Sequence, residues 1–155
     1  MDINEELFKY LFAHSEKPSE DKSTPWKRAA NPTLKEFNSN EKTGKWCLVF
    51  SPQEIDDAWT KIHKATKDGK LLLAKCSTAL GAMRFGTHLV CVYTTDWQDS
   101  EDIQKTRETL RTLGFTQPLK YKRDIETINR VYNTDNEYYI DETKDIAFNT
   151  KKYKI

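Results

Sequence analysis

The chain has 155 residues, of which 32% are charged and 37% hydrophobic, and its formal net charge is +1. A chain of this length buries a genuine core as one domain, and its high charge content excludes a membrane protein. The near-neutral charge gives no global attraction to membranes or long nucleic acids, so recognition of an anion needs a local cluster of cations.

The N-terminal segment and the cysteines indicate in which cellular compartment the protein is expected. MDINEELFKYLFAH lacks the basic start and apolar stretch of a signal peptide, and no segment approaches the roughly 20 apolar residues of a spanning helix. Cys47, Cys76 and Cys91 lie in apolar runs, form no C-x-x-C pair and have no ligand spacing with any histidine. We therefore expect reduced core cysteines, no metal ion, no cofactor and a cytoplasmic location.

The first 43 residues are expected to form a helix and a polar loop. Residues 2–14 have helical spacing, with Asp2 as the cap. The apolar stripe of this helix consists of Leu7, Phe8, Leu11 and Phe12. Residues 15–44 are polar and contain three prolines, which favours either a flexible loop or a lid over a functional site. Trp26 in this stretch either anchors the loop to the core or stacks on the ring of a ligand.

Residues 44–155 are expected to form a single α+β domain. Four runs have the length and apolar content of strands, and they are 45–50, 71–77, 88–94 and 118–124. Two amphipathic helices alternate with them. One begins at the capping sequence SPQE and ends at Gly69, and the other begins near Asp99 or Ser100 and ends at Gly114. Beyond them, IETINRVY is a short helix or turn, and the tail is typical of a hairpin.

The helices and strands together predict a fold class. Each helix has one apolar face, so each needs a sheet to cover, and the strands are short with mixed polar and apolar faces. We expect one curved, mainly antiparallel sheet with two or three helices on its convex side. The opposite face of that sheet is then partly open.

Side-chain alternation along the strands brings cations toward this open face. Lys75 shares its face with Ser77, Lys122 and His88 lie toward the ends of two other strands, and Arg84 lies in a connecting loop. Lysine, arginine and hydroxyl groups together suit a phosphate. The predicted phosphate-binding residues are Lys75, Ser77, Thr78, Arg84 and Lys122. In the alternative interpretation, these are strand-end charges whose side chains reach water.

A catalytic role is a further hypothesis for the same residues. A lysine desolvated beside other cations falls in pKa and becomes a base, for which a histidine is a suitable partner acid. Lys75 and His88 are therefore the catalytic candidates for metal-free phosphate chemistry. Trp26, Tyr93 and Tyr121 are the candidates for stacking on a base. The sequence contains no Walker loop, no dinucleotide-binding glycine motif and no nucleophile elbow.

Three blocks of the sequence carry a resemblance to a known family: GKWCLVFSPQEIDDAWTKIHKAT…GKLLLAKCST, HLVCVYTTDWQDSEDIQKTRETLRTLGF and LKYKRDIETINRVY. Over roughly residues 44–133 the chain resembles the basophilic-leukaemia-expressed protein family, whose members are often labelled phosphothreonine lyase domain proteins. The resemblance implies a fold similar to the cap-binding translation initiation factor of the 4E type. In that fold the helices lie on the convex side of a curved sheet and a ligand slot lies on the concave side.

The resemblance also points to particular residues. The family patterns AK-S-T, H…VYT-D and YK-D match Lys75, Ser77, Thr78, His88, Tyr93, Thr94, Asp96, Tyr121, Lys122 and Asp124. The lyase label implies β-elimination, in which a lysine removes the α-proton, a histidine protonates the leaving phosphate and arginines hold it. The cap-binding likeness implies a base stacked between tryptophans.

Three functions are consistent with the sequence. The first is binding, or binding and cleavage, of a phosphate-bearing, nucleotide-like small molecule such as a signalling nucleotide. The second is a phosphothreonine lyase that acts on phosphopeptides, and the third is a non-catalytic protein-interaction domain. Membranes and long nucleic acids are not expected as partners. The sequence does not indicate whether the protein is a monomer or an oligomer.

Overall fold

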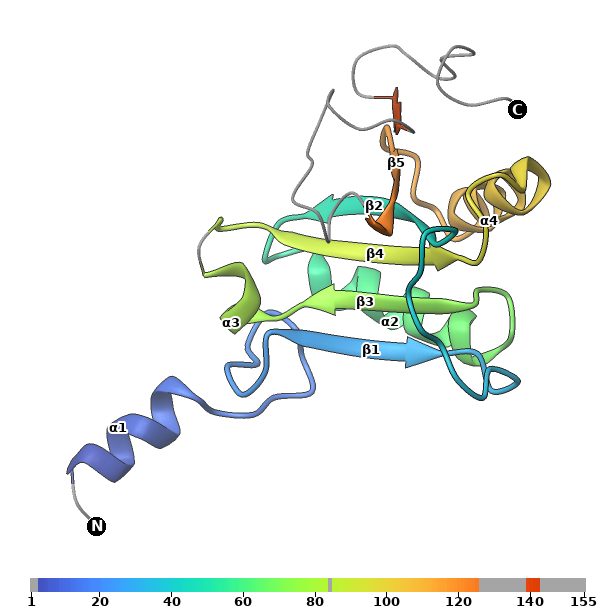
Figure 1. Cartoon of the computed structure of the whole chain (residues 1–155). Coiled ribbons are helices and arrows are strands. Elements are labelled where there is room, and N and C mark those ends of the chain that lie inside the picture. Colours follow the sequence, from blue (N-terminus) through green and yellow to red (C-terminus); the bar gives the residue numbers. More distant parts are fainter. Residues whose placement is uncertain (1–2, 84, 126–138, 143–155) are drawn as a thin grey trace.

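Figure 1 shows the computed structural model of the chain, which describes residues 3–83, 85–125 and 139–142. Within these residues six strands form one antiparallel sheet in the order β1-β3-β4-β2-β5-β6. The strands are β1 (Trp26–Ala30), β2 (Gly44–Phe50), β3 (Leu73–Ser77), β4 (His88–Thr94), β5 (Lys120–Arg123) and β6 (Tyr139–Asp141). The helices are α1 (Ile3–Leu11), α2 (Ile55–Lys67), α3 (Ala79–Ala82) and α4 (Ser100–Thr112).

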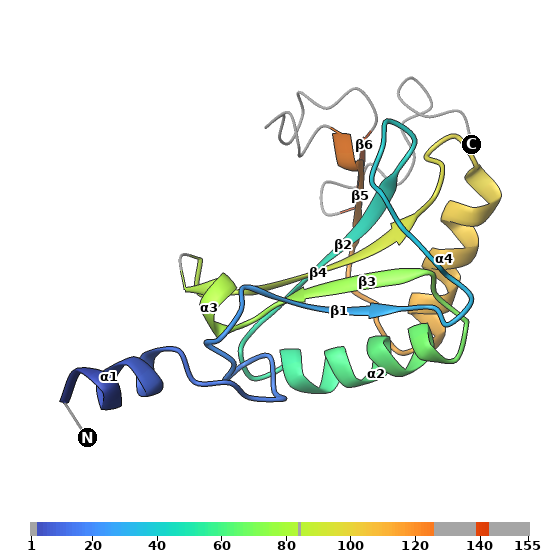
Figure 2. The ribbon, with the colours of Figure 1, turned by 60° about the horizontal axis from the view of Figure 1, so that its bottom comes forward.

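Helices α2 and α4 cover the same face of the sheet (Figure 2). Trp46 of β2 donates a hydrogen bond of 3.0 Å from Nε1 to the carbonyl of Ile103 in α4, and Ile62 of α2 is fully buried. The short helix α3 lies at one end of β3 and β4 (Figure 1). We call the sheet face opposite α2 and α4 the open face. One curved antiparallel sheet with helices on one side confirms the predicted fold class.

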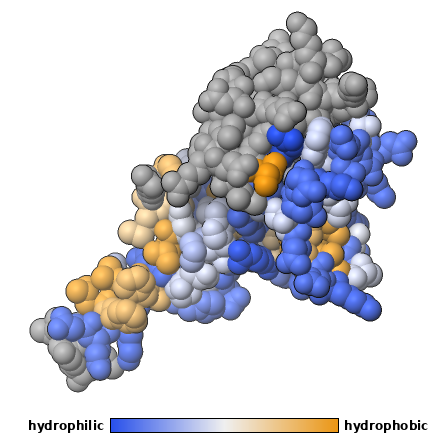
Figure 3. Space-filling view, in the orientation of Figure 1, coloured by the Kyte–Doolittle hydropathy of each residue, from blue (hydrophilic) through white to orange (hydrophobic). Residues whose placement is uncertain are grey.

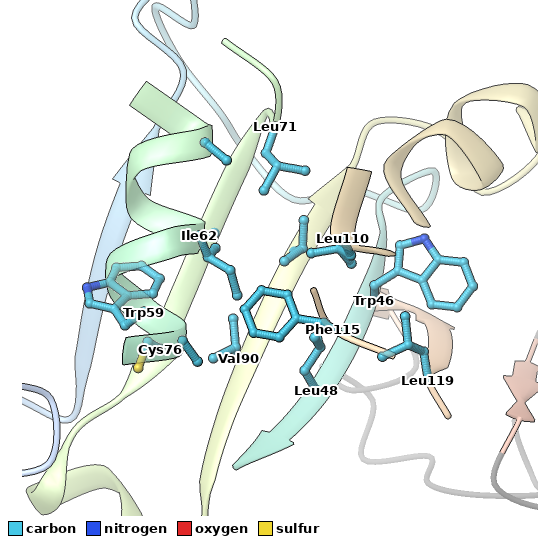
Figure 4. Packing of buried hydrophobic residues seen from close by; sticks show 14 of the residues in the cluster. Trp46, Leu48, Trp59, Ile62, Leu71, Cys76, Val90, Leu110, Phe115 and Leu119 are labelled. Atoms are coloured by element: carbon cyan, nitrogen blue, oxygen red, sulfur yellow. The ribbon is translucent and has the colours of Figure 1, made fainter. Parts of the chain in front are cut away.

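The hydrophobic core lies between the sheet and these two helices (Figure 4). Alternate residues of the central strands point into it, which is the period-two pattern of a sheet covered on one face. Its largest fully buried side chains include Trp46, Leu48, Ile62, Val90, Val92 and Leu110. Burial of each aliphatic side chain contributes about 1.5–3 kcal/mol.

The predicted ends of α2 and α4 are close to the observed ones. Residues 52–54 form a turn, and the observed cap of α2 is Glu54, three residues after the predicted cap at Ser51. The Ser51 N–H nevertheless donates to Glu54 Oε1 at 3.0 Å, which is one half of a capping box. In α4, Asp99 accepts from the Asp102 N–H at 3.2 Å, as a cap should. Gly114 then ends the helix with a φ of 103°.

The N-terminal helix α1 extends away from the sheet (Figure 2). Its predicted apolar stripe is exposed to solvent, so the space-filling view shows a hydrophobic surface at this end of the molecule (Figure 3). Phe8 is 63% exposed and packs on Phe12 with 4.8 Å between the ring centroids. The helix therefore contributes nothing to the core described above.

Strand β1 lies within the 15–44 stretch, for which the sequence predicted only a loop. It forms one edge of the sheet and pairs with β3, with Trp26 opposite Ser77 and Ala30 opposite Leu73. Its sequence, WKRAA, has little strand propensity and is flanked by Pro25 and Pro32. The following residues, 31–43, cross the open face on their way to β2 (Figure 1).

Parts of two predictions lie outside the described residues. Most of the IETINRVY stretch and most of the tail hairpin belong to these parts. Within the tail, β6 pairs with β5.

Candidate functional site

The strand register places cations from several strands on the open face. One row across the sheet consists of Arg28, Lys75, Cys91, Cys47 and Lys120. The next row consists of Ala30, Leu73, Tyr93, Lys45 and Lys122. Side chains in one row share a face because directly opposed residues of an antiparallel sheet point the same way. The open face therefore has a strongly cationic centre.

A cavity of about 290 Å³ lies on this face. It is lined by Arg28, Phe37, Ser39, Leu73, Ala74, Lys75 and Tyr93. The crossing segment 31–43 provides one wall, and Phe37 from it packs edge-on against Tyr93 with 5.7 Å between the ring centroids. The cavity thus combines two aromatic rings with two cations.

Lys75 is the central cation of this cavity. Its Nζ lies 4.1 Å from the centroid of the Trp26 ring and 6.0 Å from that of Tyr93, a cation–π arrangement. Within the described part of the chain, no carboxylate lies within ion-pair distance of Lys75. Burial lowers the pKa of Lys75, and the nearby charges of Lys45 and Arg28 act in the same direction, while Cys91 and Asp124 oppose them. An anion beside Lys75 would relieve this unfavourable environment.

Lys45 and Asp124 form a buried ion pair beside the cavity. Lys45 Nζ lies 2.6 Å from Asp124 Oδ1, and the Ser39 hydroxyl donates to the other carboxylate oxygen. Burial would raise the pKa of Asp124, but the hydrogen bonds from Lys45 and Ser39 outweigh it and the pKa falls below the ordinary value. Because its charge is satisfied, Lys45 is a structural cation, in contrast to Lys75.

Of the predicted site residues, the structure brings Lys75, Trp26 and Tyr93 together on the open face. The rings of Trp26 and Tyr93 both lie within cation–π distance of the Lys75 ammonium group. Lys122 lies on the same face, opposite Lys45 in the register. It is one strand farther from Lys75 than Lys45 is.

His88 lies on the other side of the sheet, so the predicted pairing of Lys75 with His88 does not occur. Its register partner is the core residue Phe50, and the side chain is 2% exposed. The imidazole Nδ1 is 2.7 Å from the carbonyl oxygen of Ser77. The sheet separates the two residues because the register partner of Lys75 is Cys91, and His88 lies three positions from Cys91 in the same strand, on the opposite face.

Tyr121 is also a core residue rather than a stacking residue of the open face. Its ring packs edge-on against Trp46 with 5.1 Å between centroids, and it is fully buried. Its hydroxyl is 2.6 Å from the hydroxyl of Thr94. The alternation that places Lys122 on the open face requires Tyr121 to point away from it.

The hydroxyls of Ser77 and Thr78 have hydrogen-bond partners within the protein, and both residues are buried. Ser77 Oγ accepts from the Leu89 N–H at 2.8 Å, and Ser77 is 4% exposed. Thr78 caps α3 by accepting from the Gly81 N–H at 3.2 Å, and it donates to the carbonyl of Thr24. Arg84 lies outside the described residues.

Sequence reasoning missed the residues that complete the cavity. Arg28, Phe37 and Ser39 lie in the 15–44 stretch, whose position over the sheet has no local sequence signal. Lys45 was visible as the first residue of a predicted strand, and Asp124 matched a family pattern, but their contact spans 79 positions of the chain. Only the pairing of β2 with β5 reveals it.

Metal-binding and membrane-spanning features were sought among the residues that the structure describes. These residues contain no group of three histidine, cysteine or acidic side chains placed to hold a metal ion. They also contain no helix with the length and apolar character needed to cross a bilayer.

Comparisons with known proteins agree with this fold. A family model described as "Basophilic leukemia-expressed protein Bles03" matches residues 15–128. The match therefore includes β1 and the crossing segment as well as the region of resemblance described above.

Two solved structures from C. elegans have a similar fold. The complex of eIF4E-3 with the 4E-binding protein Mextli and a cap analog has a TM-score of 0.56 and 16% identity, and the alignment covers 80% of this chain and 76% of that one. The complex of eIF4E-3 with Mextli has a TM-score of 0.51 and 16% identity, with coverage of 79% and 76%. At this level of identity the likeness concerns the fold alone.

Proposed function

Because the chain belongs to the basophilic leukemia-expressed protein Bles03 family and has an initiation factor 4E-like fold, we propose that its open face binds a small, phosphate-bearing, nucleotide-like ligand. The observation that carries this proposal is the environment of Lys75. This lysine is half-buried between two aromatic rings, beside Arg28, and has no carboxylate partner among the described residues. A phosphate would supply the missing negative charge.

The shape of the cavity supports a ligand of nucleotide size. Small-molecule pockets range from about 300 to 1,000 Å³, and the cavity of about 290 Å³ lies just below the lower limit of that range. Phe37, Tyr93 and Trp26 offer ring faces or edges, and stacking on a base contributes about 1–3 kcal/mol. One fold neighbour was solved with a cap analog, which supports a small ligand on this architecture without identifying it.

The geometry supports binding more than catalysis. A lyase or a phosphodiesterase of the expected type needs a base and an acid that reach the same substrate, but His88 and Lys75 lie on opposite faces of the sheet. We therefore propose binding as the function and assign no acid–base pair. The alternative function is a protein-interaction domain in which the cations are structural. The following experiment distinguishes this alternative from ligand binding.

The test is thermal stabilisation by a panel of nucleoside mono-, di- and triphosphates and cyclic dinucleotides. At least one ligand is expected to raise the melting temperature of the wild type, since a ligand at a hundredfold excess over its Kd stabilises by about 2.7 kcal/mol. Lys75→Ala should abolish this shift. Lys67→Ala removes the same charge from an exposed position of α2 and should retain it.

Two results would overturn the proposal. One is a panel in which no phosphate-bearing compound shifts the melting temperature of the wild type. The other is a shift that Lys75→Ala and Lys67→Ala preserve equally, because binding would then not depend on the cavity.

A further inference from the structure

Two of the three cysteines lie directly opposite each other on neighbouring strands. Cys47 of β2 is the register partner of Cys91 of β4, and both thiols are free. Directly opposed residues in antiparallel strands have Cα atoms about 4.5–5.5 Å apart, within the range of about 4.4–6.8 Å that a disulfide spans. Both side chains point to the open face, whereas Cys76 belongs to the core cluster on the helix side.

The two thiols differ in accessibility. Cys47 is half-buried, whereas Cys91 is 1% exposed. A small solute from solvent therefore reaches Cys47 first, and Cys91 is positioned behind it as a second thiol. The arrangement matches that of an attacking cysteine beside a resolving cysteine.

The surroundings of the pair are cationic on both sides. In the same row of the sheet, Lys75 is opposite Cys91 and Lys120 is opposite Cys47. A hydrogen bond from Cys91 lowers the pKa of the Cys47 thiol to about 7 against the effect of burial, and Lys45, Lys122 and Lys120 lower it further. The pKa of Cys91 is raised, chiefly by its hydrogen bond to Cys47 and by burial. Of the two thiols, Cys47 therefore ionises at the lower pH, and the thiolate is the form that reacts with oxidants.

We propose that Cys47 and Cys91 form a redox-active dithiol that a hydroperoxide converts into an intramolecular disulfide between β2 and β4. The Cys47 thiolate attacks one peroxide oxygen and breaks the O–O bond, which gives the sulfenic acid at Cys47 and one hydroxide that is protonated to water. The Cys91 thiol then attacks the Cys47 sulfur and displaces a second water. In total two thiols lose two electrons and two protons, and hydrogen peroxide is reduced to two water molecules.

This inference goes beyond ligand binding and does not depend on it. The disulfide would form in the floor of the open face, between the row partners Lys75 and Lys120. It requires only the register of β2 and β4 and the accessibility of Cys47.

The test is peptide mapping of the full chain after treatment with stoichiometric hydrogen peroxide and alkylation of the remaining thiols under denaturing conditions. Trypsin places the three cysteines in separate peptides, which are 46–61, 76–84 and 85–105. We expect a cross-link between 46–61 and 85–105, full alkylation of Cys76, and loss of the cross-link after reduction with dithiothreitol. The cross-link should persist in Cys76→Ser and disappear in Cys47→Ser.

The Cys91→Ser variant, or Cys91→Ala if serine disturbs the buried position, tests the order of the steps. Without the resolving thiol, the sulfenic acid at Cys47 should accumulate and react with dimedone. The proposal is overturned if the wild type keeps three alkylatable thiols, if a cross-link involves Cys76 or a second chain, or if Cys47 proceeds to sulfinic acid without pairing.

Discussion

Lys45 and Asp124 show how one pair of residues stabilises the open face. Their charged groups are 2.6 Å apart and the two side chains are only 4% and 11% exposed. Removal of one partner from a buried pair leaves an uncompensated charge and costs about 3–5 kcal/mol. Asp124→Asn should therefore lower the free energy of unfolding by about 3 kcal/mol in urea denaturation.

The matched control for this variant is Asp57→Asn. Asp57 pairs with Lys61 on the surface of α2 at 3.2 Å, with side chains 79% and 48% exposed. Surface pairs contribute about 0–1 kcal/mol, so this change should have a small effect. Equal losses in the two variants would contradict a special role for burial at Asp124.

The pH dependence of the Asp124 contribution has a definite sign. The pKa of Asp124 in the folded chain lies below the ordinary value of 3.8, so the folded state binds this proton less readily than the unfolded state. The stabilisation is then fully present above the ordinary pKa and is lost as the pH falls through the folded pKa. The stability difference between wild type and Asp124→Asn should stay constant near neutral pH and shrink in strong acid, as urea denaturation at successive pH values can measure.

The lowered pKa of Lys75 leads us to expect that the protein takes up a proton at this side chain when a phosphate ligand binds. Burial lowers the pKa of this lysine in the free protein, and a neighbouring phosphate raises it again. Affinity should therefore fall as the pH rises through the pKa of Lys75 in the free protein. Calorimetry in two buffers with different ionisation heats measures the uptake, and its presence in a Lys75→Met variant with residual binding would refute the assignment.

At the scale of single elements, α1 is predicted to be dispensable for the stability of the domain. Its apolar residues are exposed, with Leu7 at 52% and Tyr10 at 69%, and the helix extends away from the sheet (Figures 2 and 3). Deletion of residues 1–11 should change the unfolding free energy by less than about 1 kcal/mol, a shift of about 2–4 °C or less for a domain of this size.

The control for the deletion is a change inside the core. Ile62→Ala in α2 creates a cavity at a fully buried position and should cost about 2–5 kcal/mol. If loss of α1 lowered the melting temperature as much as Ile62→Ala, the helix would have to pack on the domain in solution.

The elements also show what can be predicted from sequence. The strands and helices with a clear period, such as β4 over 88–94 and α4 with its Asp99 cap, lie where periodicity and capping place them. Alternation within β5 also explains why Tyr121, a predicted stacking residue, lies in the core while Lys122 lies on the open face. However, the same alternation places His88 and Lys75 on opposite faces once β3 and β4 are paired, and strand pairing is a long-range property.

Strand β1 is a second element whose position depends on long-range pairing and could not be predicted from the local sequence. Its five residues have a pattern that no local rule identifies as a strand, and it is stabilised by pairing with β3 rather than by its own propensity. The 15–44 stretch was considered as a lid over a functional site, but without β1 its residues Arg28, Phe37 and Ser39 were not identified as lining the cavity. Lys75, in contrast, lies in a strand whose pattern the sequence shows.

At the scale of the whole molecule, the two faces of the sheet have different roles. The face under α2 and α4 carries the hydrophobic core, and the open face carries the cations, the thiol pair and the cavity. The sheet is one cooperative unit because every strand pairs with its neighbours. A ligand on the open face can therefore stabilise the entire domain while it contacts only one side of it.

The molecule also has a second polar cavity, of about 470 Å³, at the edge where β1 meets α2. It is lined by Glu16, Lys27, Arg28, Trp59, Thr60, His63 and Lys64. Because Arg28 borders both cavities, variants of Arg28 do not distinguish them. Phe37→Ala and His63→Ala distinguish the two cavities, since each variant changes the lining of only one of them.

Hydrogen exchange can locate the ligand between these two cavities. Residues 35–42 make few backbone hydrogen bonds, so their amides should exchange rapidly in the free protein. A nucleotide between Lys75 and Phe37 should slow exchange in 31–43 and leave 59–64 of α2 unchanged.

Phe37→Ala should then weaken binding by about 1–3 kcal/mol through lost stacking, and His63→Ala should have no effect. Protection confined to 59–64, with the opposite response of the two variants, would place the ligand in the second cavity and remove the support that Lys75 gives to the proposed function.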